Sequence, residues 1–291
     1  MIVHKLEPQG FCKGVIGAIK LAKSAINDPN IKKPIYMLGS LIHNQHVINE
    51  LTNLGIIIID EKNKTRLELL DLIDNNSGTI IISAHGASSL VFEKAKERGF
   101  DVLDATCPYV SLVHNKVNKH IKDGYDIIYI GTKNHPECEG VIGNNNKIKL
   151  ITSIDDINNL DINNDKIYVT NQTTLSIYDI KNIYDVIIKK YPTATIDDKI
   201  CMATTERQKA VYESPVVDLC IIIGDIRSSN TKKLEEVARK KGLNTLLVDS
   251  LDDLKNKLPN NIKSVSITSG ASTPDFITNE IIDYLKNKWD S

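Results

Sequence analysis

Three of the five cysteines recur at nearly equal distances along the sequence. Cys12, Cys107 and Cys201 are separated by about a third of the 291-residue chain, and a similar length follows the last of them. This spacing indicates three repeats of one domain-sized unit. Thiolates that meet at one point suit a soft metal centre, because iron–sulfur clusters are held by Cys thiolates, usually four. With three thiolates, one iron of a cubane stays open and can act as a Lewis acid on a substrate oxygen.

Polar side chains that can bind anions follow apolar runs in each third of the chain. Imidazole groups can carry positive charge near neutral pH, and hydroxyl and amide groups at strand ends or helix starts donate hydrogen bonds beside free backbone N–H groups. We therefore predict a pocket for a diphosphate or a polycarboxylate. The candidate anion-binding residues are His43, His85, His135, Thr173, Ser228, Ser229, Asn230 and Ser272.

Glu137 is the one acid among these strand-end motifs that stands next to a candidate ligand loop. It follows His135 and Pro136, shortly after the apolar run 126–130. A bound anion nearby should raise the pKa of its carboxyl group, which suits a proton donor. We predict that Glu137 is the catalytic acid.

Each of these residue types also has an ordinary structural role. A single Cys after a strand is more often a buried small residue than a ligand, and Ser or Thr before a helix is by default an N-cap. The matching offsets in the three thirds favour the functional interpretation for the set, whereas Cys220 lies inside an apolar run and is expected in the core. The histidines outside the repeated pattern are expected to be structural: His4, His46, His114 and His120.

Strands and helices alternate along the whole chain, and this order predicts α/β units with small, mostly parallel sheets. Ligands of open α/β sheets sit beyond the carboxyl ends of the strands, where the polar candidates lie. We predict three similar α/β domains, arranged pseudo-threefold around a central iron–sulfur cluster cavity. The first unit comprises residues 1–106, in which 1–12 supply an opening strand and the cysteine loop; the second comprises 107–200, and the third comprises 201–291 with a C-terminal helix.

The composition excludes several other classes of protein. A formal net charge of −1 offers no broad basic surface, so we expect no nucleic-acid partner. No apolar run approaches the roughly 18 residues of a membrane span, so we expect no membrane association. An odd cysteine count without a CxxC pair argues against a disulfide framework and a local zinc clip. The N-terminus lacks a signal-peptide pattern, and we expect a cytoplasmic protein, or a plastid one if a transit peptide had been removed.

Eight short motifs resemble those of one known enzyme family. They occur in order over nearly the whole chain and resemble the 4-hydroxy-3-methylbut-2-enyl diphosphate reductase family, also called the IspH or LytB family. The motifs are GFCKGV at 10–15, SAHG at 83–86, DATCP at 104–108, HPE at 135–137, NQTTLS at 171–176, CMATT at 201–205, SSN at 228–230 and TSGAS at 268–272.

The resemblance implies three α/β domains around one [4Fe–4S] cluster per subunit, and an activity in the last step of the non-mevalonate isoprenoid pathway. In that step the hydroxyl group of the allylic diphosphate is removed with two electrons and two protons. The products are isopentenyl and dimethylallyl diphosphates. The resemblance implies a ferredoxin or a flavodoxin as the electron donor.

The resemblance also implies a role for each candidate residue. The three cysteines would bind the cluster and leave one iron open for the substrate hydroxyl. Glu137 would supply the proton that turns this hydroxyl into water, with Thr173 as a hydrogen-bonding neighbour of both. The diphosphate shell would consist of His43, His85, His135, Ser228, Ser229, Asn230 and Ser272.

Two other functions are compatible with three evenly spaced cysteines. Quinolinate synthase is another three-domain enzyme with a three-cysteine cluster, and it condenses an iminoaspartate with a triose phosphate without net reduction. The HPE and SSN motifs favour the reductase instead. The non-enzymatic alternative is an α/β metal-storage or redox-sensing module that binds zinc through its thiols.

Overall fold

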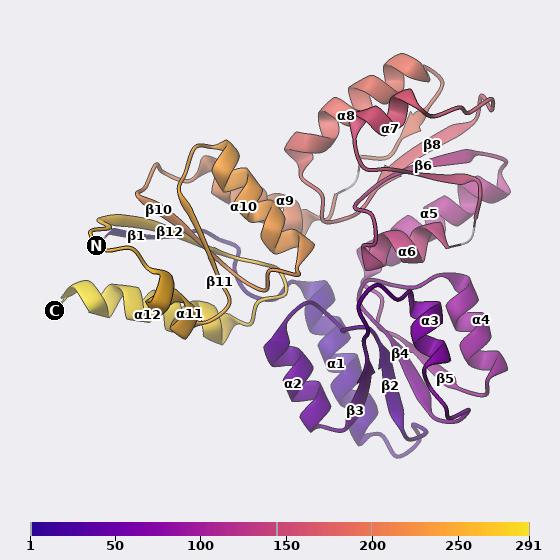
Figure 1. Ribbon diagram of the computed structural model, residues 1–291, viewed down its shortest axis with the longest axis horizontal. Helices are drawn as coiled ribbons and strands as arrows, with labels where there is room; N and C mark the ends of the chain where they lie inside the picture. Colours follow the sequence, from indigo (N-terminus) through magenta and orange to yellow (C-terminus); the bar gives the residue numbers. More distant parts are fainter. Residues whose placement is uncertain (1, 144, 199, 291) are drawn as a thin grey trace.

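Three separate parallel sheets organise the chain, as the computed structural model shows (Figure 1). The structure describes residues 2–143, 145–198 and 200–290, in which twelve strands and twelve helices alternate. Each sheet has four strands, and every pair of neighbouring strands is parallel. The sheets and their helices form three lobes around a common centre. This confirms the predicted fold class of three small parallel α/β units.

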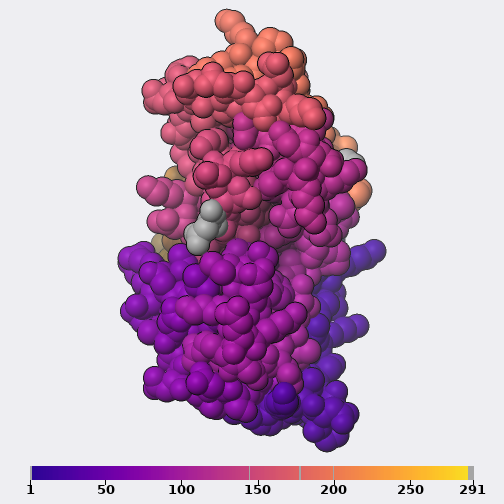
Figure 2. All heavy atoms as spheres, turned by 90° about the vertical axis from the view of Figure 1, so that its right-hand side faces the viewer, coloured from indigo at the N-terminus to yellow at the C-terminus, as the bar shows by residue number. Residues whose placement is uncertain are grey.

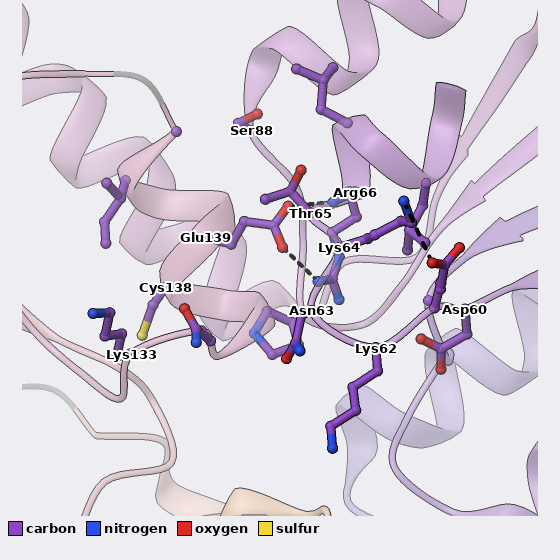
Figure 3. A pocket seen from close by; sticks show the side chains of 18 of the residues that line it. Asp60, Lys62, Asn63, Lys64, Thr65, Arg66, Ser88, Lys133, Cys138 and Glu139 are labelled. Carbon is purple, nitrogen blue, oxygen red and sulfur yellow. Dashed lines mark hydrogen bonds and ion pairs between the residues drawn. The ribbon is translucent and has the colours of Figure 1, made fainter. Parts of the chain in front are cut away.

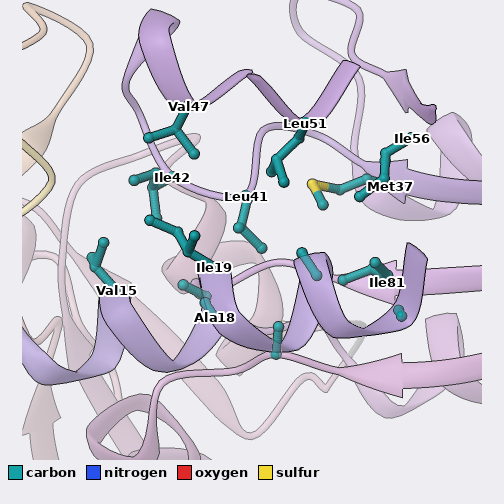
Figure 4. Packing of buried hydrophobic residues seen from close by; sticks show 14 of the residues in the cluster. Val15, Ala18, Ile19, Met37, Leu41, Ile42, Val47, Leu51, Ile56 and Ile81 are labelled. Atoms are coloured by element: carbon teal, nitrogen blue, oxygen red, sulfur yellow. The ribbon is translucent and has the colours of Figure 1, made fainter. Parts of the chain in front are cut away.

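The first sheet has the strand order β3-β2-β4-β5. Strands β2 and β4 are buried at every position, as expected for central parallel strands with helices on both faces. On one face, Ala18 and Ile19 of the first helix share an apolar cluster with Met37, Leu41 and Ile81 (Figure 4). The elements of this unit are α1 (Lys13–Asn27), β2 (Ile35–Leu38), α2 (Gln45–Asn53), β3 (Ile56–Ile59), α3 (Arg66–Asp71), β4 (Thr79–Ile82), α4 (Ser89–Glu97) and β5 (Asp101–Asp104).

The second sheet has the strand order β7-β6-β8-β9. Along strand β6, Ile128 and Ile130 belong to one apolar cluster, and Ile127 and Tyr129 belong to another. This alternation places a core on each face of the sheet. The elements of this unit are α5 (Pro108–Lys122), β6 (Asp126–Ile130), α6 (Pro136–Ile142), β7 (Ile148–Ile151), α7 (Ile154–Asn158), β8 (Ile167–Asn171), α8 (Ile177–Lys190) and β9 (Thr195–Ile196).

The third sheet has the strand order β1-β12-β10-β11. Strand β10 is buried at every position, and Cys220 of this strand lies in an apolar core cluster, as predicted. The elements of this unit are β1 (Ile2–Lys5), α9 (Met202–Glu213), β10 (Leu219–Ile223), α10 (Ser229–Lys240), β11 (Thr245–Val248), α11 (Leu251–Lys257), β12 (Ser264–Ser269) and α12 (Asp275–Asp290).

The strand that precedes each cysteine lies in a different sheet from the strands that follow that cysteine. β5 pairs with β4, β9 pairs with β8, and β1 pairs with β12 at the opposite end of the chain. We predicted that the first strand opens the first unit, and this was wrong, because β1 belongs to the third sheet. Its apolar pattern shows that a strand forms but not which strand it joins.

The three units meet at the carboxyl ends of their strands. Seen from the side, atoms of the first and second units meet along a broad front on one face of the molecule (Figure 2). In the part of the chain that the structure describes, no helix is both long enough and apolar enough to cross a bilayer.

Candidate active site

All twelve residues predicted from the sequence line one cavity between the three units. They come from nine separate loops and the helix starts that follow them, so the folding of the whole chain brings them together. Apolar side chains from the same loops complete the wall. The predicted residues are Cys12, His43, His85, Cys107, His135, Glu137, Thr173, Cys201, Ser228, Ser229, Asn230 and Ser272, and the apolar ones are Val15, Ile42, Ala84, Val110, Ala203 and Ala271.

Each of the three cysteines is the N-cap residue of a helix. Cys12 precedes α1, Cys107 precedes α5, and Cys201 precedes α9. The positive end of a helix dipole stabilises negative charge at such a position, including a thiolate. All three helices therefore direct a favourable field at the same cavity.

The backbone of each cysteine is held by a loop of another unit. The N–H of Cys12 donates to the carbonyl of Ala271 at 3.1 Å, and the N–H of Cys107 donates to that of Ala84 at 3.0 Å. The N–H of Cys201 donates to the carbonyl of Thr173 at 3.2 Å. Each unit thus fixes one thiol of the next unit in a closed cycle.

Burial disfavours the thiolate forms of Cys107 and Cys201 in this cavity. Burial raises the pKa of the Cys107 and Cys201 thiols. The charges of Cys12 and Cys201 raise that of Cys107 further, and the charges of Cys12 and Glu137 raise that of Cys201. Backbone N–H groups, such as those of Tyr109 and Val110 for Cys107, act in the opposite direction. A bound metal would reverse the balance, because coordination deprotonates a thiol.

The three thiols that line the cavity are the donor type that an iron–sulfur cluster requires. Among the described residues, no group of three or more His, Cys, Asp or Glu side chains is arranged to hold one metal ion. In a cubane each thiolate binds a different iron, so the ligands stand further apart. Gly14 leaves room at this place, because an added Cβ would lie 2.5 Å from the Cys107 sulfur and 3.9 Å from the Cys12 sulfur. The donor set therefore fits an iron–sulfur cluster.

Glu137 is buried and held at the start of α6. The backbone N–H of Thr173 donates to its Oε1 at 2.7 Å, and the Thr173 hydroxyl donates to its Oε2 at 2.9 Å. The hydroxyl of Tyr129 lies 3.4 Å from Oε1. Burial raises the pKa of Glu137 to about 7, although these hydrogen bonds act to lower it. The carboxyl group can therefore hold and release a proton near neutral pH.

Three imidazole rings gather beside Glu137. The ring of His85 lies 4.9 Å from that of His43 and 5.6 Å from that of His135, centroid to centroid. Nδ1 of His135 accepts a hydrogen bond from the backbone N–H of Glu137 at 3.1 Å, so the neutral ring carries its proton on Nε2. Nε2 of His85 and Nε2 of His135 are buried and have no hydrogen-bond partner in the described part of the chain.

The histidine cluster is poised to accept an anion. Burial and the neighbouring cations lower the pKa of all three rings, that of His135 to about 3. A polyanion in the cavity would offset both effects, because an opposite charge favours the protonated form. The unpaired Nε2 atoms are therefore ready donors for a phosphate group.

The third unit contributes hydroxyl and amide groups from the start of α10. Ser228 is the N-cap and accepts from the N–H of Thr231 at 3.3 Å, while the Ser272 hydroxyl lies 3.4 Å from that of Ser228. Both side-chain polar atoms of Asn230 are buried without a partner among the residues described. The helix begins at Ser229, so Ser229 and Asn230 lie in its first turn. The capping and the anion-binding interpretations of these residues are thus compatible.

Comparison with known proteins identifies the family. The model of the LytB protein family matches residues 3–286. The chain belongs to the LytB protein family. Two curated relatives are the 4-hydroxy-3-methylbut-2-enyl diphosphate reductases of Geobacillus kaustophilus (strain HTA426), 43% identical, and Bacillus cereus (strain AH187), 42% identical. Each alignment spans 289 residues, which is 98% of this chain and 90% of the relative.

Two solved structures share the fold of this LytB chain. The E-1-hydroxy-2-methyl-but-2-enyl-4-diphosphate reductase from Plasmodium falciparum aligns with a TM-score of 0.88 at 33% identity, covering 98% of this chain and 88% of that one. An (E)-4-hydroxy-3-methyl-but-2-enyl diphosphate reductase, described as the terminal enzyme of the non-mevalonate pathway, aligns with a TM-score of 0.67 at 31% identity. That alignment covers 99% of this chain and all of the other. The family predicted from the motifs is confirmed, and the quinolinate synthase alternative is not favoured.

Some residues around the site of this LytB protein were missed in the sequence. Gln172 accepts from the Cys138 thiol and donates to Thr174 and Ser229, which links the second unit to α10. Its position next to Thr173 was the available signal, because Gln172 is itself a polar residue directly after strand β8. Gly14 was visible in the first motif, but its contact with a thiol 93 positions away was not.

A buried ion pair beside the cavity was also missed. Arg66 of α3 donates from its backbone N–H and from its guanidinium to the carboxylate of Glu139 on α6, at 2.6 and 3.0 Å (Figure 3). The pair joins the first unit to the helix that carries Glu137. It lies in a hollow of about 630 Å³ that Lys62 and Lys133 also line.

Proposed function

We propose that the chain is a 4-hydroxy-3-methylbut-2-enyl diphosphate reductase. The observation that carries this proposal is the convergence of three N-cap thiols, a buried acid and unpaired anion donors in one cavity. The substrate alcohol would take up two electrons and two protons. One proton leaves with the hydroxyl group as water and the other ends on carbon, which yields isopentenyl and dimethylallyl diphosphates.

Cys12, Cys107 and Cys201 would hold a [4Fe–4S] cluster with one iron that has no protein ligand. When bound, such a cluster supplies electrons and a Lewis-acidic iron for the substrate oxygen. The family is one of iron–sulfur enzymes, and the number of ligands and the cluster type are part of this proposal. The helix N-termini would stabilise the thiolates.

The diphosphate would lie against the histidine cluster and the start of α10. His85 and His135 would donate from Nε2, and Asn230 from its amide, since these groups lack partners in the described structure. His43, Ser228, Ser229 and Ser272 would complete this shell. The apolar wall would face the isoprenoid carbons.

Glu137 would donate the proton to the departing hydroxyl group. A pKa of about 7 lets it carry the proton at neutral pH, and Thr173 would hold both the carboxylate and the substrate hydroxyl in place. The electrons would arrive from a ferredoxin or a flavodoxin, one at a time.

Anaerobic purification followed by iron, sulfide and product analysis tests this function. We expect about four irons per chain, an absorbance spectrum that changes when the allylic diphosphate is added, and the two isomeric diphosphates as products. Protein that cannot be reconstituted with iron, or that releases no isoprenoid diphosphate under reduction, would rule the proposal out. Stoichiometric zinc without iron would support the storage or sensing alternative.

A further inference from the structure

Arg207 is a buried cation that has no carboxylate partner. It lies on α9, two turns beyond Cys201, with 2% of its surface exposed. No ion pair forms to it among the residues that the structure describes, and its Nε atom is buried without a hydrogen-bond partner. The other buried arginine, Arg66, is paired with Glu139 at 3.0 Å. The charge of Arg66 is therefore balanced by a carboxylate, whereas that of Arg207 is not balanced by one in the described part of the chain.

The hydrogen bonds of Arg207 join two of the cysteine loops. Nη1 donates to the carbonyl of Ala203, in the first turn after Cys201, at 2.9 Å. Nη2 donates to the carbonyl of Gly10, two residues before Cys12, at 2.7 Å and is 3.4 Å from that of Gln9. Arg207 thus clamps the Cys12 loop to the Cys201 helix.

Carbonyl groups alone do not balance a buried charge. Removing a guanidinium from water costs several kcal/mol, and this penalty is offset only by an opposite charge with good geometry. Burial lowers the pKa of Arg207, and the charges of Cys12, Cys201, Glu206 and Asp275 act to raise it again. The two segments that Arg207 joins carry Cys12 and Cys201, which line the cavity, so a negatively charged group bound there would lie close to the guanidinium.

We propose that Arg207 is the fixed counter-cation of the metal cluster held by Cys12, Cys107 and Cys201. This inference rests on the proposed function. Three thiolates on a [4Fe–4S]²⁺ core leave a net charge of −1, and uptake of one electron makes it −2. A positive charge held nearby favours the more negative state, so Arg207 should raise the reduction potential of the cluster. It acts as a positioning and electrostatic residue and does not touch the substrate.

Redox titration of reconstituted variants tests the counter-cation role without measuring turnover. The variants are Arg207→Gln, which removes the charge, and Arg207→Lys, which keeps it. The matched control is Lys209→Gln, because Lys209 is exposed on the same helix and loses the same charge. At a fixed ambient potential we expect about tenfold less reduced cluster in Arg207→Gln than in the wild type, a shift of about 59 mV for one electron. Arg207→Lys should shift less, and Lys209→Gln should match the wild type.

The outcomes separate this inference from the proposed function. Wild-type protein without an iron–sulfur cluster would reject the proposed function itself. A wild-type cluster together with an unchanged potential in Arg207→Gln would reject the counter-cation role alone. If Arg207→Gln binds no iron, Arg207→Lys decides: a cluster with a near-wild-type potential supports the charge role, and loss of iron from both variants overturns it in favour of a purely structural clamp.

Discussion

The proposed proton donor, Glu137, has to be protonated before the reaction, and burial favours this by raising its pKa to about 7. In Glu137→Gln the side chain keeps its shape but has no acidic proton. We expect turnover to fall by roughly 10²–10⁴-fold while the iron content stays at the wild-type level. Glu280→Gln, at an exposed position of α12, is the matched control and should have no effect. Wild-type turnover of Glu137→Gln in a steady-state assay would exclude the proton-donor role.

The raised pKa of Glu137 also predicts how stability depends on pH. Its pKa is about 7 in the folded chain and 4.5 without perturbation, so the folded state binds the proton more tightly. Stability should therefore fall as pH rises from about 4.5 to 7, by about 3 kcal/mol from this group. The lowered pKa of His135 makes stability rise with pH between about 3 and 6.5, which opposes the effect of Glu137. The contribution of Glu137 is therefore measured as the difference between the wild type and a variant that lacks the carboxyl group.

Thermal unfolding of the wild type and Glu137→Gln at pH 5 and pH 8 isolates this contribution. The midpoint of the variant relative to the wild type should be higher at pH 8 than at pH 5, because the variant has no carboxylate to bury. A difference that is the same at both pH values would show that Glu137 has an ordinary pKa.

Gly14 lets the backbone of α1 approach the Cys107 thiol closely. In Gly14→Ala the new Cβ would lie 2.5 Å from the Cys107 sulfur, so the thiol has to move. We expect substoichiometric iron after anaerobic reconstitution, measured by iron and sulfide analysis. Gly17→Ala is the matched control on the same helix, because nothing lies within 4 Å of its added Cβ. Full iron in Gly14→Ala would mean that Cys107 does not need its present position.

At the scale of elements, local patterns were sufficient to find strands and the polar groups at their ends. Most strands are short apolar runs, and the twelve site residues were predicted because they follow such runs or cap the next helix. The sequence could not predict which strand pairs with β1, because parallel pairing joins residues as distant as Ile2 and Ser264 without any local signal. Arg207 shows the same limit. Its spacing from Thr204 and Val211 places it on the buried face of α9, yet only the folded chain reveals that no carboxylate of the described residues pairs with it.

The contact between α3 and α6 predicts a second kind of variant. Glu139→Gln leaves the buried guanidinium of Arg66 without a counter-charge, which should destabilise the protein by about 2–3 kcal/mol. Since α6 carries His135 and Glu137, we also expect a higher KM for the diphosphate. Thermal unfolding and steady-state kinetics measure these two effects. The double variant Arg66→Met/Glu139→Met should recover most of the stability. Equal losses in Glu139→Gln and the double variant would show that the unpaired guanidinium is not what destabilises Glu139→Gln.

At the scale of the whole molecule, the site depends on a closed cycle of units. Each cysteine is anchored to a carbonyl of another unit, and β1 joins the first cysteine loop to the last sheet. Deleting residues 2–5 should therefore lower the iron content as well as the thermal midpoint, although no ligand is removed. A deletion variant with full iron and a lower midpoint would show that β1 stabilises the third sheet without positioning Cys12.

The pairing of β1 with β12 sets an order of events during synthesis on the ribosome. The first strand to emerge finds its partner only after residue 264 has been added, which takes on the order of 10 s or more at roughly 5–20 residues per second. Until then the Cys12 loop lacks its bond to Ala271 and its clamp from Arg207. The three thiols therefore reach their final arrangement only in the finished chain, and a cluster that needs all three is inserted after translation has ended.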